Sequence, residues 1–317
     1  MALMATIYSS HNVDGGASPR GLVATTGVFD GVHRGHRHLL DTVTREALKR
    51  GLGAAVVTFD NHPSQVLAPD RRLSLLMTLD DKLRTLREYG IDNIFVLHFT
   101  RELSVMSSRD FITMLHRDYG VEVLVAGFNH RFGHDGGDVD SVADLPVEIV
   151  RAGEYAGPEA PVSSSVIRRL LAEGDVVEAA RKLGRRYRVA GRVGHGRRNG
   201  TAIGFPTANV TDLDPALALP AVGAYAVTVT LDDGTYGGMA AIGYRPTVDH
   251  SARPALSVEV NIFDYDGDLY GHRIALSFVE RLRDERRMTD LDQLRRQLTD
   301  DRRRAEALLT SINSSIT

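Results

Sequence analysis

The hydrophobic pattern of this 317-residue chain changes its period once, near residues 184–187. Before that point short β-rich runs alternate with amphipathic stretches of helical spacing, and after it strand-like runs follow one another. Alternating strands and helices favour a parallel sheet covered by helices, whereas consecutive short strands favour an antiparallel sheet or a small barrel. We therefore predict two domains, residues 1–184 and residues 185–317, in a chain long enough for two cores.

The first domain is predicted to be a Rossmann-like α/β fold. Its strand-like runs are LVATTGVF, AAVVTF, NIFVLHF and VEVLVAG. Thr78 and Ser107 are each followed three residues later by Asp, a pattern similar to a capping box, so both are predicted to open helices. The first helix is predicted to end at Gly51 and to follow a helical spacing through Leu39, Leu40, Val43 and Leu48.

The second domain is predicted to be all-β, a small antiparallel β-barrel with a C-terminal helix. Its strand-like runs are YAVTVTL, MAAIGY, ALSVEVNIF and RIALSF, with DDG at 232–234 and DGD at 266–268 as hairpin turns. The final helix is expected from Thr289 to about Ile312, where leucines recur at helical spacing.

Composition limits the partners and the chemistry. A formal net charge of −3 leaves no broad basic footprint, so nucleic acid is not expected as a partner. The chain has no cysteine, which removes disulfides, thiolate catalysis and cysteine-ligated metals. It also lacks a secretory signal and any apolar run as long as a membrane helix needs, so we expect a cytoplasmic protein without membrane contact.

The stretch GVFDGVHRGH at 27–36 lies where the first predicted strand passes into the first helix. Ligands bind at this carboxyl edge of open parallel sheets, and glycines allow a phosphate to approach the backbone beside a helix N-terminus. His33 and His36 add donors that can become cationic near neutral pH. A tight turn with solvated histidines, or metal binding by the pair, would explain a lone HxxH, although no further zinc ligand stands at a suitable spacing. The order HxGH directly after a strand instead resembles the signature of the HIGH-type nucleotidyltransferases, which transfer a nucleotidyl group and release pyrophosphate.

Three further segments fit that resemblance. FDNHP at 59–63 and GFNHRFG at 127–133 end later strands, and SSSVIR at 163–168 opens a helix. In such families the serine-rich helix start holds the triphosphate, and serine hydroxyls, a helix N-terminus and Arg168 all favour an anion. Taken alone, SSSVIR would be an ordinary helix cap.

The second domain opens with a glycine-rich run that bears arginines, GRVGHGRRNG at 191–200, and this run could cradle phosphates. It is not a P-loop, because none of the three lysines of the chain follows a glycine. In FPTAN, Thr207 and Asn209 lie two residues apart, so an extended backbone points both oxygens to one side. Such oxygens beside ATP phosphates suit Mg²⁺, although a polar turn into a strand is the plainer interpretation.

Further on, SVEVNIFDYDGDLYG alternates with period 2 and puts Glu259 on the face opposite to Val258 and Val260. A carboxylate in mid-strand ordinarily faces solvent. If this face lines a ligand pocket instead, Glu259 can take a proton from an alcohol that attacks phosphorus. The arginine-rich run at 281–304 is interleaved with acidic residues and is predicted to be a solvated helix face.

Over almost its full length the chain resembles the bifunctional prokaryotic riboflavin kinase/FMN adenylyltransferase family. The resemblance is carried by GVFDGVHRGH, GFNHRFG and SSSVIR, and then by GFPTANV, VGAYAV, IGYRPT and VEVNIFDYDGDLYG. It implies a HIGH-type nucleotidyltransferase domain followed by a riboflavin kinase barrel. The implied reactions are phosphorylation of riboflavin to FMN and adenylylation of FMN to FAD, with ATP as co-substrate and Mg²⁺ as cofactor.

By the same resemblance, Glu259 would be the general base on the ribityl 5′-hydroxyl, while Thr207 and Asn209 would hold Mg²⁺. His33 and His36 would stabilise the charge that develops at the α-phosphorus of ATP. The nucleotide and its phosphates would contact Gly27, Phe29, Asp30, Gly35, Asn129, Arg131, Ser164, Arg168, Gly196 and Gly204.

Four residues depart from what is usual in the family: Asn61 stands in place of proline, Ser165 of threonine, Thr201 of arginine and Asn261 of histidine. Three alternatives stand beside the bifunctional interpretation. Only one half could be active. The chain could be a flavin-binding regulator without turnover, although binding alone does not require the base and the histidines. The first half could also serve another acceptor, which leaves FPTAN and the barrel without a purpose.

Overall fold

The computed structural model describes residues 6–9, 21–70, 73–128, 131–137, 142–194, 204–244, 256–285 and 290–313. The chain forms two compact units, Met1–Ser163 and Ser164–Thr317. The segment between Ser164 and residue 184 therefore groups with the second unit. The predicted boundary after residue 184 stays a proposal for where the two catalytic modules separate.

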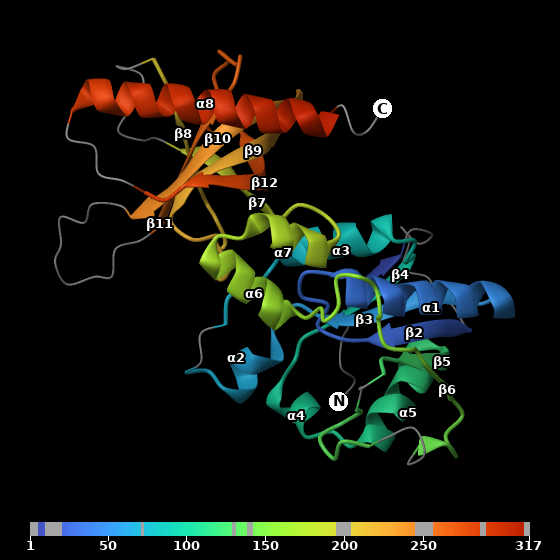
Figure 1. Cartoon of the computed structure of the whole chain (residues 1–317). Helices are drawn as coiled ribbons and strands as arrows, with labels where there is room; N and C mark the ends of the chain where they lie inside the picture. The colour runs from blue at the N-terminus through green and yellow to red at the C-terminus, as the bar shows by residue number, and fades with distance from the viewer. Residues whose placement is uncertain are drawn as a thin grey trace. The chain divides into compact units, whose positions relative to one another are not determined.

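The first unit is built on a six-stranded sheet in the order β1-β4-β3-β2-β5-β6 (Figure 1). Strands β2 to β6 pair in parallel, and β1 pairs antiparallel with β4 at the edge. The predicted parallel sheet is thus confirmed, whereas the short edge strands β1 and β6 were not predicted. The strands are β1 (Thr6–Ser9), β2 (Leu22–Thr26), β3 (Gly53–Phe59), β4 (Asn93–Leu97), β5 (Val121–Ala126) and β6 (Glu148–Arg151).

Helices cover both faces of this sheet (Figure 1). Consecutive residues of β2 point to opposite faces, and Val23 and Ala24 accordingly belong to different core clusters. The cluster of Val23 takes in α1 and α3, and the cluster of Ala24 takes in α4 and α5. Burial on both faces explains why the strand sequences are continuously apolar. The helices are α1 (Arg34–Arg50), α2 (Pro63–Leu67), α3 (Leu79–Glu88), α4 (Arg101–Ser104) and α5 (Ser108–Tyr119).

The predicted helix ends are confirmed. The Thr78 hydroxyl accepts a hydrogen bond from the backbone N–H three residues later at 3.2 Å, and Ser107 does the same at 3.1 Å. Gly51 ends α1 with a φ of 67°, a left-handed conformation that glycine adopts easily. Leu48 does not face the core as its spacing suggested. It is 85% exposed, and Ala47 takes the buried position instead, which continues the spacing of three to four residues from Val43.

The second unit begins with α6 (Ser164–Glu173) and α7 (Val176–Leu183) and continues as a closed six-stranded barrel. The barrel order is β10-β11-β8-β7-β12-β9, and every pairing is antiparallel. The predicted antiparallel barrel is therefore confirmed. Its strands are β7 (Arg188–Gly194), β8 (Ala208–Thr211), β9 (Gly223–Leu231), β10 (Gly234–Tyr244), β11 (Leu256–Ile262) and β12 (Arg273–Arg283).

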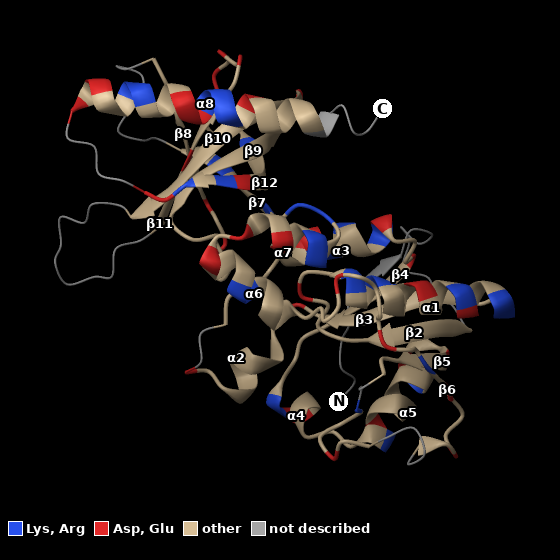
Figure 2. Ribbon diagram, viewed as in Figure 1, with Lys and Arg blue, Asp and Glu red and all other residues tan. Residues whose placement is uncertain are grey.

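Successive residues of the barrel strands point alternately into the barrel and outward, and some outward residues pack against the C-terminal helix α8 (Leu291–Asn313). Tyr225 and Val227 of β9 are fully buried inside. Ala226, between them, joins Ala305 and Leu309 of α8 in a separate apolar cluster. Basic and acidic side chains are interleaved along α8 (Figure 2), as predicted for that part of the run 281–304. The prediction of a helix face is wrong for Arg281 and Arg283, which lie on strand β12.

One of the two predicted hairpins is wrong. The turn at 232–234 joins β9 to β10, which pair directly, so that prediction is confirmed. Strands β11 and β12 are separated in the barrel by β8 and β7, so DGD at 266–268 lies in a longer connection, residues 263–272. A turn sequence shows that the chain bends but does not show which strand the next one pairs with.

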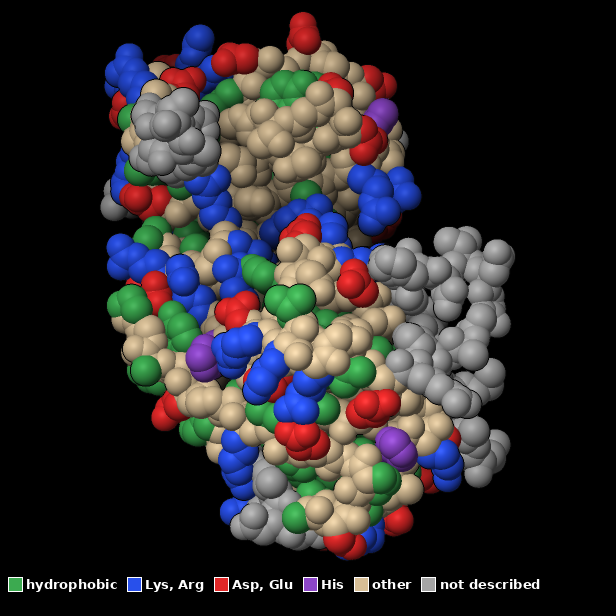
Figure 3. Space-filling model, turned by 90° about the vertical axis from the view of Figure 1, so that its right-hand side faces the viewer, with side chains coloured by type: hydrophobic (Ala, Val, Ile, Leu, Met, Phe, Trp, Pro, Cys, Tyr) green, Lys and Arg blue, Asp and Glu red, His purple; other side chains and the backbone are tan. Residues whose placement is uncertain are grey.

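Side chains of both charge signs are interspersed over the face shown in Figure 3. This distribution is in keeping with a formal net charge of −3. In the part of the chain that the structure describes, no helix combines the length and the apolar character needed to cross a membrane.

Candidate active sites

The first candidate site is the loop that joins β2 to α1. The N–H of Gly27 donates to the Val57 carbonyl of the adjacent strand β3 at 3.1 Å. The backbone then passes through positive φ at Phe29 (51°), Gly31 (86°) and Val32 (37°). Residues other than glycine rarely adopt such angles. The bend leads the chain to the N-terminus of α1 at the carboxyl edge of the sheet, where the sequence predicted the site.

His33 and His36 lie together at the start of α1. His33 caps the helix, because its Nδ1 accepts a hydrogen bond from the backbone N–H of His36 at 3.3 Å. The two imidazole rings stack with centroids 3.6 Å apart and 12° between their planes. A Cβ on Gly35 would come within 3.3 Å of the His33 ring, so glycine leaves room for it. Since Nδ1 accepts, a neutral His33 carries its proton on Nε2.

Phe29 and Asp30, which were predicted to contact ATP, are only 1% and 4% exposed. The Phe29 ring lies 5.1 Å from the His36 ring, and a Cβ on Gly27 would come within 3.2 Å of the same phenyl group. Asp30 Oδ1 accepts a hydrogen bond from the N–H of Leu76 at 2.8 Å. These side chains support the loop from within. Contact of Phe29 and Asp30 with the nucleotide stays a prediction.

FDNHP continues this edge of the sheet at the end of β3. The Asn61 side chain donates to the Phe99 carbonyl at 2.9 Å and accepts from the Phe99 N–H at 2.8 Å. Proline, the residue that the family resemblance leads us to expect here, has no side-chain amide and could not form this pair. The departure at Asn61 therefore ties the segments that follow β3 and β4. Beside it, His98 Nδ1 lies 2.9 Å from Asp60 Oδ1.

GFNHRFG follows β5, and Asn129 lies outside the described residues. Phe128 is 49% exposed. Arg131 is also exposed, and its Nη1 donates to the Gly136 carbonyl at 3.3 Å. An exposed guanidinium near the carboxyl end of a sheet strand fits the predicted phosphate contact, which stays a prediction.

SSSVIR opens a helix as predicted, because α6 begins at Ser164, in the second compact unit. Ser164 and Arg168 are half-buried and stand four residues apart, so they lie one turn apart on the same side of α6. Ser165, where the resemblance leads us to expect threonine, is exposed. Binding of pyrophosphate by Ser164 and Arg168 stays a prediction.

The second candidate site lies on the barrel, where β11 meets β8. Glu259 stands directly opposite Asn209 in the strand register. The Thr207 hydroxyl, just before β8, donates to Glu259 Oε2 at 3.3 Å. Val258 and Val260, the neighbours of Glu259, are buried inside the barrel, so the polar side chains share the other face. The structure thus brings together the three residues that the sequence proposed for phosphoryl transfer.

Asn261 holds FPTAN against β11. Its Nδ2 donates to the Pro206 carbonyl at 2.7 Å, and the side chain is only 4% exposed. Its Oδ1 is buried without a hydrogen-bond partner among the described residues. The sequence marked Asn261 only as a departure from a frequent histidine. The structure makes it the residue that fixes the backbone immediately before Thr207.

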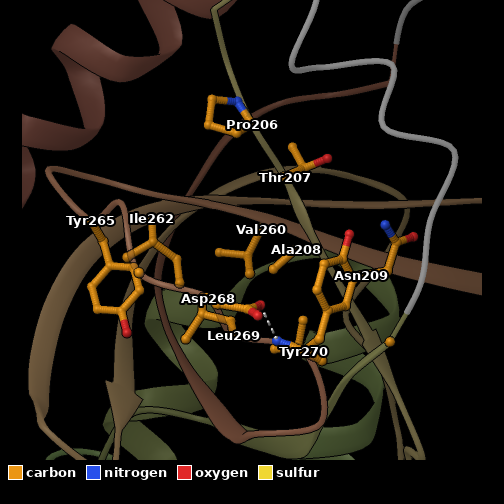
Figure 4. A pocket seen from close by; sticks show the side chains of 13 residues that line it. Pro206, Thr207, Ala208, Asn209, Val260, Ile262, Tyr265, Asp268, Leu269 and Tyr270 are labelled. Carbon is orange, nitrogen blue, oxygen red and sulfur yellow. Dashed lines mark hydrogen bonds between the residues drawn. The ribbon is translucent and has the colours of Figure 1, made fainter.

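A pocket of about 160 Å³ opens beside this cluster (Figure 4). Pro206, Thr207 and Asn209 line it on the side of β8, and Tyr265 and Tyr270 of the connection 263–272 line it elsewhere. Thr207 and Asn209 therefore border both the pocket and Glu259. Sequence reasoning missed the two tyrosines because it took their segment for a hairpin. The apolar part of the lining comes from Val193, Val260, Ile262 and Leu269.

Of the predicted glycine contacts in this half, Gly196 lies outside the described residues, as does Thr201. Gly204 has a φ of 82°, and among the described residues other than its chain neighbours no heavy atom lies within 4 Å of a Cβ placed on it. Backbone conformation rather than crowding thus favours glycine there. Its contact with phosphate stays a prediction.

Fold and candidate sites together fit a two-module transferase, with a candidate nucleotidyl-transfer site at the edge of a Rossmann-like sheet and a candidate phosphoryl-transfer site on a barrel. Comparison with protein families makes this specific. The FAD synthetase family matches residues 16–165, and the riboflavin kinase family matches residues 183–309. The chain belongs to the bifunctional riboflavin kinase/FMN adenylyltransferase family.

Individual relatives agree with this assignment. The bifunctional riboflavin kinase/FMN adenylyltransferase of Listeria monocytogenes is 34% identical, with 98% of this chain and 99% of that protein covered. Its Escherichia coli counterpart is 35% identical, with 94% and 96% covered. A solved structure titled as a macrolide-efflux protein from Streptococcus pneumoniae superposes with a TM-score of 0.85 at 30% identity. That superposition covers 92% of this chain and 95% of the other.

Proposed function

We infer that this chain phosphorylates riboflavin with ATP to give FMN, and then adenylylates FMN with a second ATP to give FAD and pyrophosphate. Membership of the family supports both reactions. Because one chain contains the chemical groups for both reactions, we infer that it carries them out one after the other. The kinase assignment is carried by one observation, the register that sets Glu259 opposite Asn209 with the Thr207 hydroxyl 3.3 Å away.

In the kinase module, Glu259 takes the proton of the ribityl 5′-hydroxyl as that oxygen attacks the γ-phosphorus of ATP. The bond from phosphorus to the bridging oxygen of ADP breaks, and ADP leaves. The hydrogen bond from the Thr207 hydroxyl keeps the Glu259 carboxylate in one orientation. Asn261 supports this arrangement by holding the backbone of Pro206.

Thr207 and Asn209 fit a magnesium ion. Mg²⁺ takes oxygen ligands, keeps several waters and relies on substrate phosphates, so two neutral oxygens beside a carboxylate are an adequate protein contribution. The Thr207 hydroxyl donates its proton to Glu259, which leaves its lone pairs available to a cation. When bound, Mg²⁺ neutralises charge on the ATP phosphates.

In the transferase module, the phosphate of FMN attacks the α-phosphorus of ATP, and pyrophosphate leaves. His33, His36 and the N-terminal N–H groups of α1 stabilise the negative charge at that phosphorus. Ser164 and Arg168 hold the departing pyrophosphate. No covalent enzyme intermediate is required, because positioning and electrostatics suffice for this displacement.

The pocket beside Thr207 and Asn209 receives one end of a kinase substrate. Its volume of about 160 Å³ accepts part of a ligand rather than a whole flavin or nucleotide. Aromatic side chains at its rim favour a flat ring system.

The test is chromatography of riboflavin incubated with the full chain, Mg²⁺ and excess ATP, with FMN and FAD followed over time. Transient FMN followed by FAD is the expected result. FMN alone would leave the transferase assignment without support. Unchanged riboflavin, together with flavin binding, would favour the regulator interpretation instead.

A further inference from the structure

The loop between β2 and α1 has a backbone that its own residues do not favour. Phe29 and Val32 both have positive φ, at 51° and 37°. Val32 is β-branched, and a left-handed conformation is a genuine outlier for such a residue. Strained backbone of this kind persists only where the surroundings hold it. The loop leads directly into His33, so whatever holds it also sets the position of the proposed transfer site.

Side chains from outside the loop hold it at two points. Asp30 Oδ1 accepts from the N–H of Leu76 at 2.8 Å. The Thr58 hydroxyl, from the end of β3, donates to the Val28 carbonyl at 3.2 Å. Thr58 is itself held by a further hydrogen bond. Lys82 Nζ, from α3, donates to the same hydroxyl oxygen at 3.3 Å.

Lys82 is buried, which is unusual for a lysine. Its side chain is 6% exposed, and Thr58 is 0% exposed. Besides Thr58, Nζ donates to the Phe59 carbonyl at 2.8 Å. A hydroxyl has one proton to donate and two lone pairs to accept with, so Thr58 can pass the contact on from Lys82 to Val28. The result is a buried relay from α3 through β3 to the strained loop.

The positive charge of Lys82 has a second effect on the loop, besides the hydrogen bonds. Burial lowers the pKa of Lys82 to about 8, while the Asp30 and Asp60 carboxylates act in the opposite direction. Asp60 in turn contacts His98. Asp30 belongs to a loop that receives anionic phosphates in the proposed mechanism, where a carboxylate repels its ligand. An ammonium buried close to Asp30 offsets that repulsion.

We propose that Lys82 is a positioning residue for adenylyl transfer. Through Thr58 it fixes the Val28 carbonyl, and through its charge it compensates Asp30, so the loop keeps the shape that receives the triphosphate of ATP. The proposal rests on the transferase function inferred above. Lys82 touches no reacting atom and lies outside every motif that identified the site. It should therefore change the handling of ATP and leave riboflavin phosphorylation unaffected.

The experiment uses the full chain with Lys82→Met, Thr58→Val and Thr58→Ser, and with Lys49→Met as the matched control at an exposed lysine. FMN adenylylation is measured against ATP and FMN concentration, and riboflavin phosphorylation is measured in the same preparations. We expect Lys82→Met to lower kcat/KM for ATP about tenfold, since hydrogen bonds to charged groups have effects of this size. The KM for FMN and the kinase rate should stay at the wild-type values.

The threonine variants separate positioning from general damage. Thr58→Val should share the loss, Thr58→Ser should restore activity because it keeps the hydroxyl, and the Lys82→Met/Thr58→Val double variant should lose no more than the single ones. Wild-type kinetics in Lys82→Met, or equal kinetics in Thr58→Val and Thr58→Ser, would overturn the proposal. If the unaltered chain forms FMN but no FAD, the failure belongs to the transferase assignment and not to Lys82.

Discussion

The two candidate sites owe their geometry to different kinds of structure. The transferase site is an irregular loop with positive φ at Phe29 and Val32, held by side chains from neighbouring segments. The kinase site is a strand register, in which paired backbones set Glu259 opposite Asn209. A register is maintained by many backbone hydrogen bonds, whereas a loop depends on a few side-chain tethers. Substitutions of residues outside the transferase site should therefore change its activity, whereas the activity of the kinase site should depend mainly on residues in direct contact with it.

The largest expected effect is local to the barrel. Glu259→Gln removes the base but keeps the shape and the strand pairing, so riboflavin phosphorylation should fall about 1000-fold, within the range for loss of a general base. The rate is measured by FMN formation at saturating ATP. Glu280→Gln is the matched control, because Glu280 of β12 accepts a hydrogen bond from Arg304 of α8 and has no role in the site. A loss below tenfold in Glu259→Gln would contradict the role of base.

The second effect concerns the buried support of the loop. The pKa of Lys82 is lowered from 10.5 to about 8, chiefly by burial, so the unfolded chain binds more protons than the folded one between these values. The free energy of unfolding should therefore rise with pH across that window by roughly 3 kcal/mol, and the destabilisation that the buried charge of Lys82 causes should be fully present below pH 8.

Urea unfolding at pH 7.5 and pH 10 measures this rise. Lys82→Met should lack this rise in the free energy of unfolding, whereas Lys49→Met, at an exposed site, should keep it. The same pH dependence in Lys82→Met and in the unaltered chain would show that the lysine is not desolvated as the structure indicates.

The smallest effect concerns the proposed magnesium site. Thr207→Val keeps the shape but removes the hydroxyl, so the Mg²⁺ concentration for half-maximal kinase activity should rise about tenfold, the effect of one lost polar contact to a charged group. Thr211→Val is the control, because the Thr211 hydroxyl donates to the Arg192 carbonyl at 3.1 Å away from Glu259. An unchanged Mg²⁺ requirement would remove Thr207 from the metal site.

The same contrast explains what could be predicted from the sequence. Period and helix caps predicted the parallel sheet, the barrel and the helix starts at Thr78 and Ser107, because these signals are local. The joint role of Glu259, Thr207 and Asn209 was implied by the resemblance to a known family. Alternation along a strand predicted only which neighbours of Glu259 face the other way, and the pairing of β8 with β11 that brings the three residues together was not predicted.

Contacts between segments distant in sequence were not predictable in this way. The connection 263–272 was mistaken for a hairpin, since its turn residues do not reveal that β8 and β7 stand between β11 and β12. Lys82 and Asn261 were missed as supporting residues for the same reason, because their partners lie on other strands and loops. A usable signal existed for Lys82. It falls between Leu79, Leu83 and Leu86 on the apolar side of its helix, where a lysine is unexpected.

The most direct test of two separate sites is a crossed assay of Glu259→Gln and His36→Ala in the full chain. Each variant is given riboflavin with ATP and Mg²⁺ in one reaction, and FMN with ATP and Mg²⁺ in another. We predict that Glu259→Gln loses FMN formation but still converts supplied FMN to FAD. His36→Ala should form FMN at the wild-type rate and convert it to FAD at least 100-fold more slowly. Loss of both reactions in either folded variant would contradict the account.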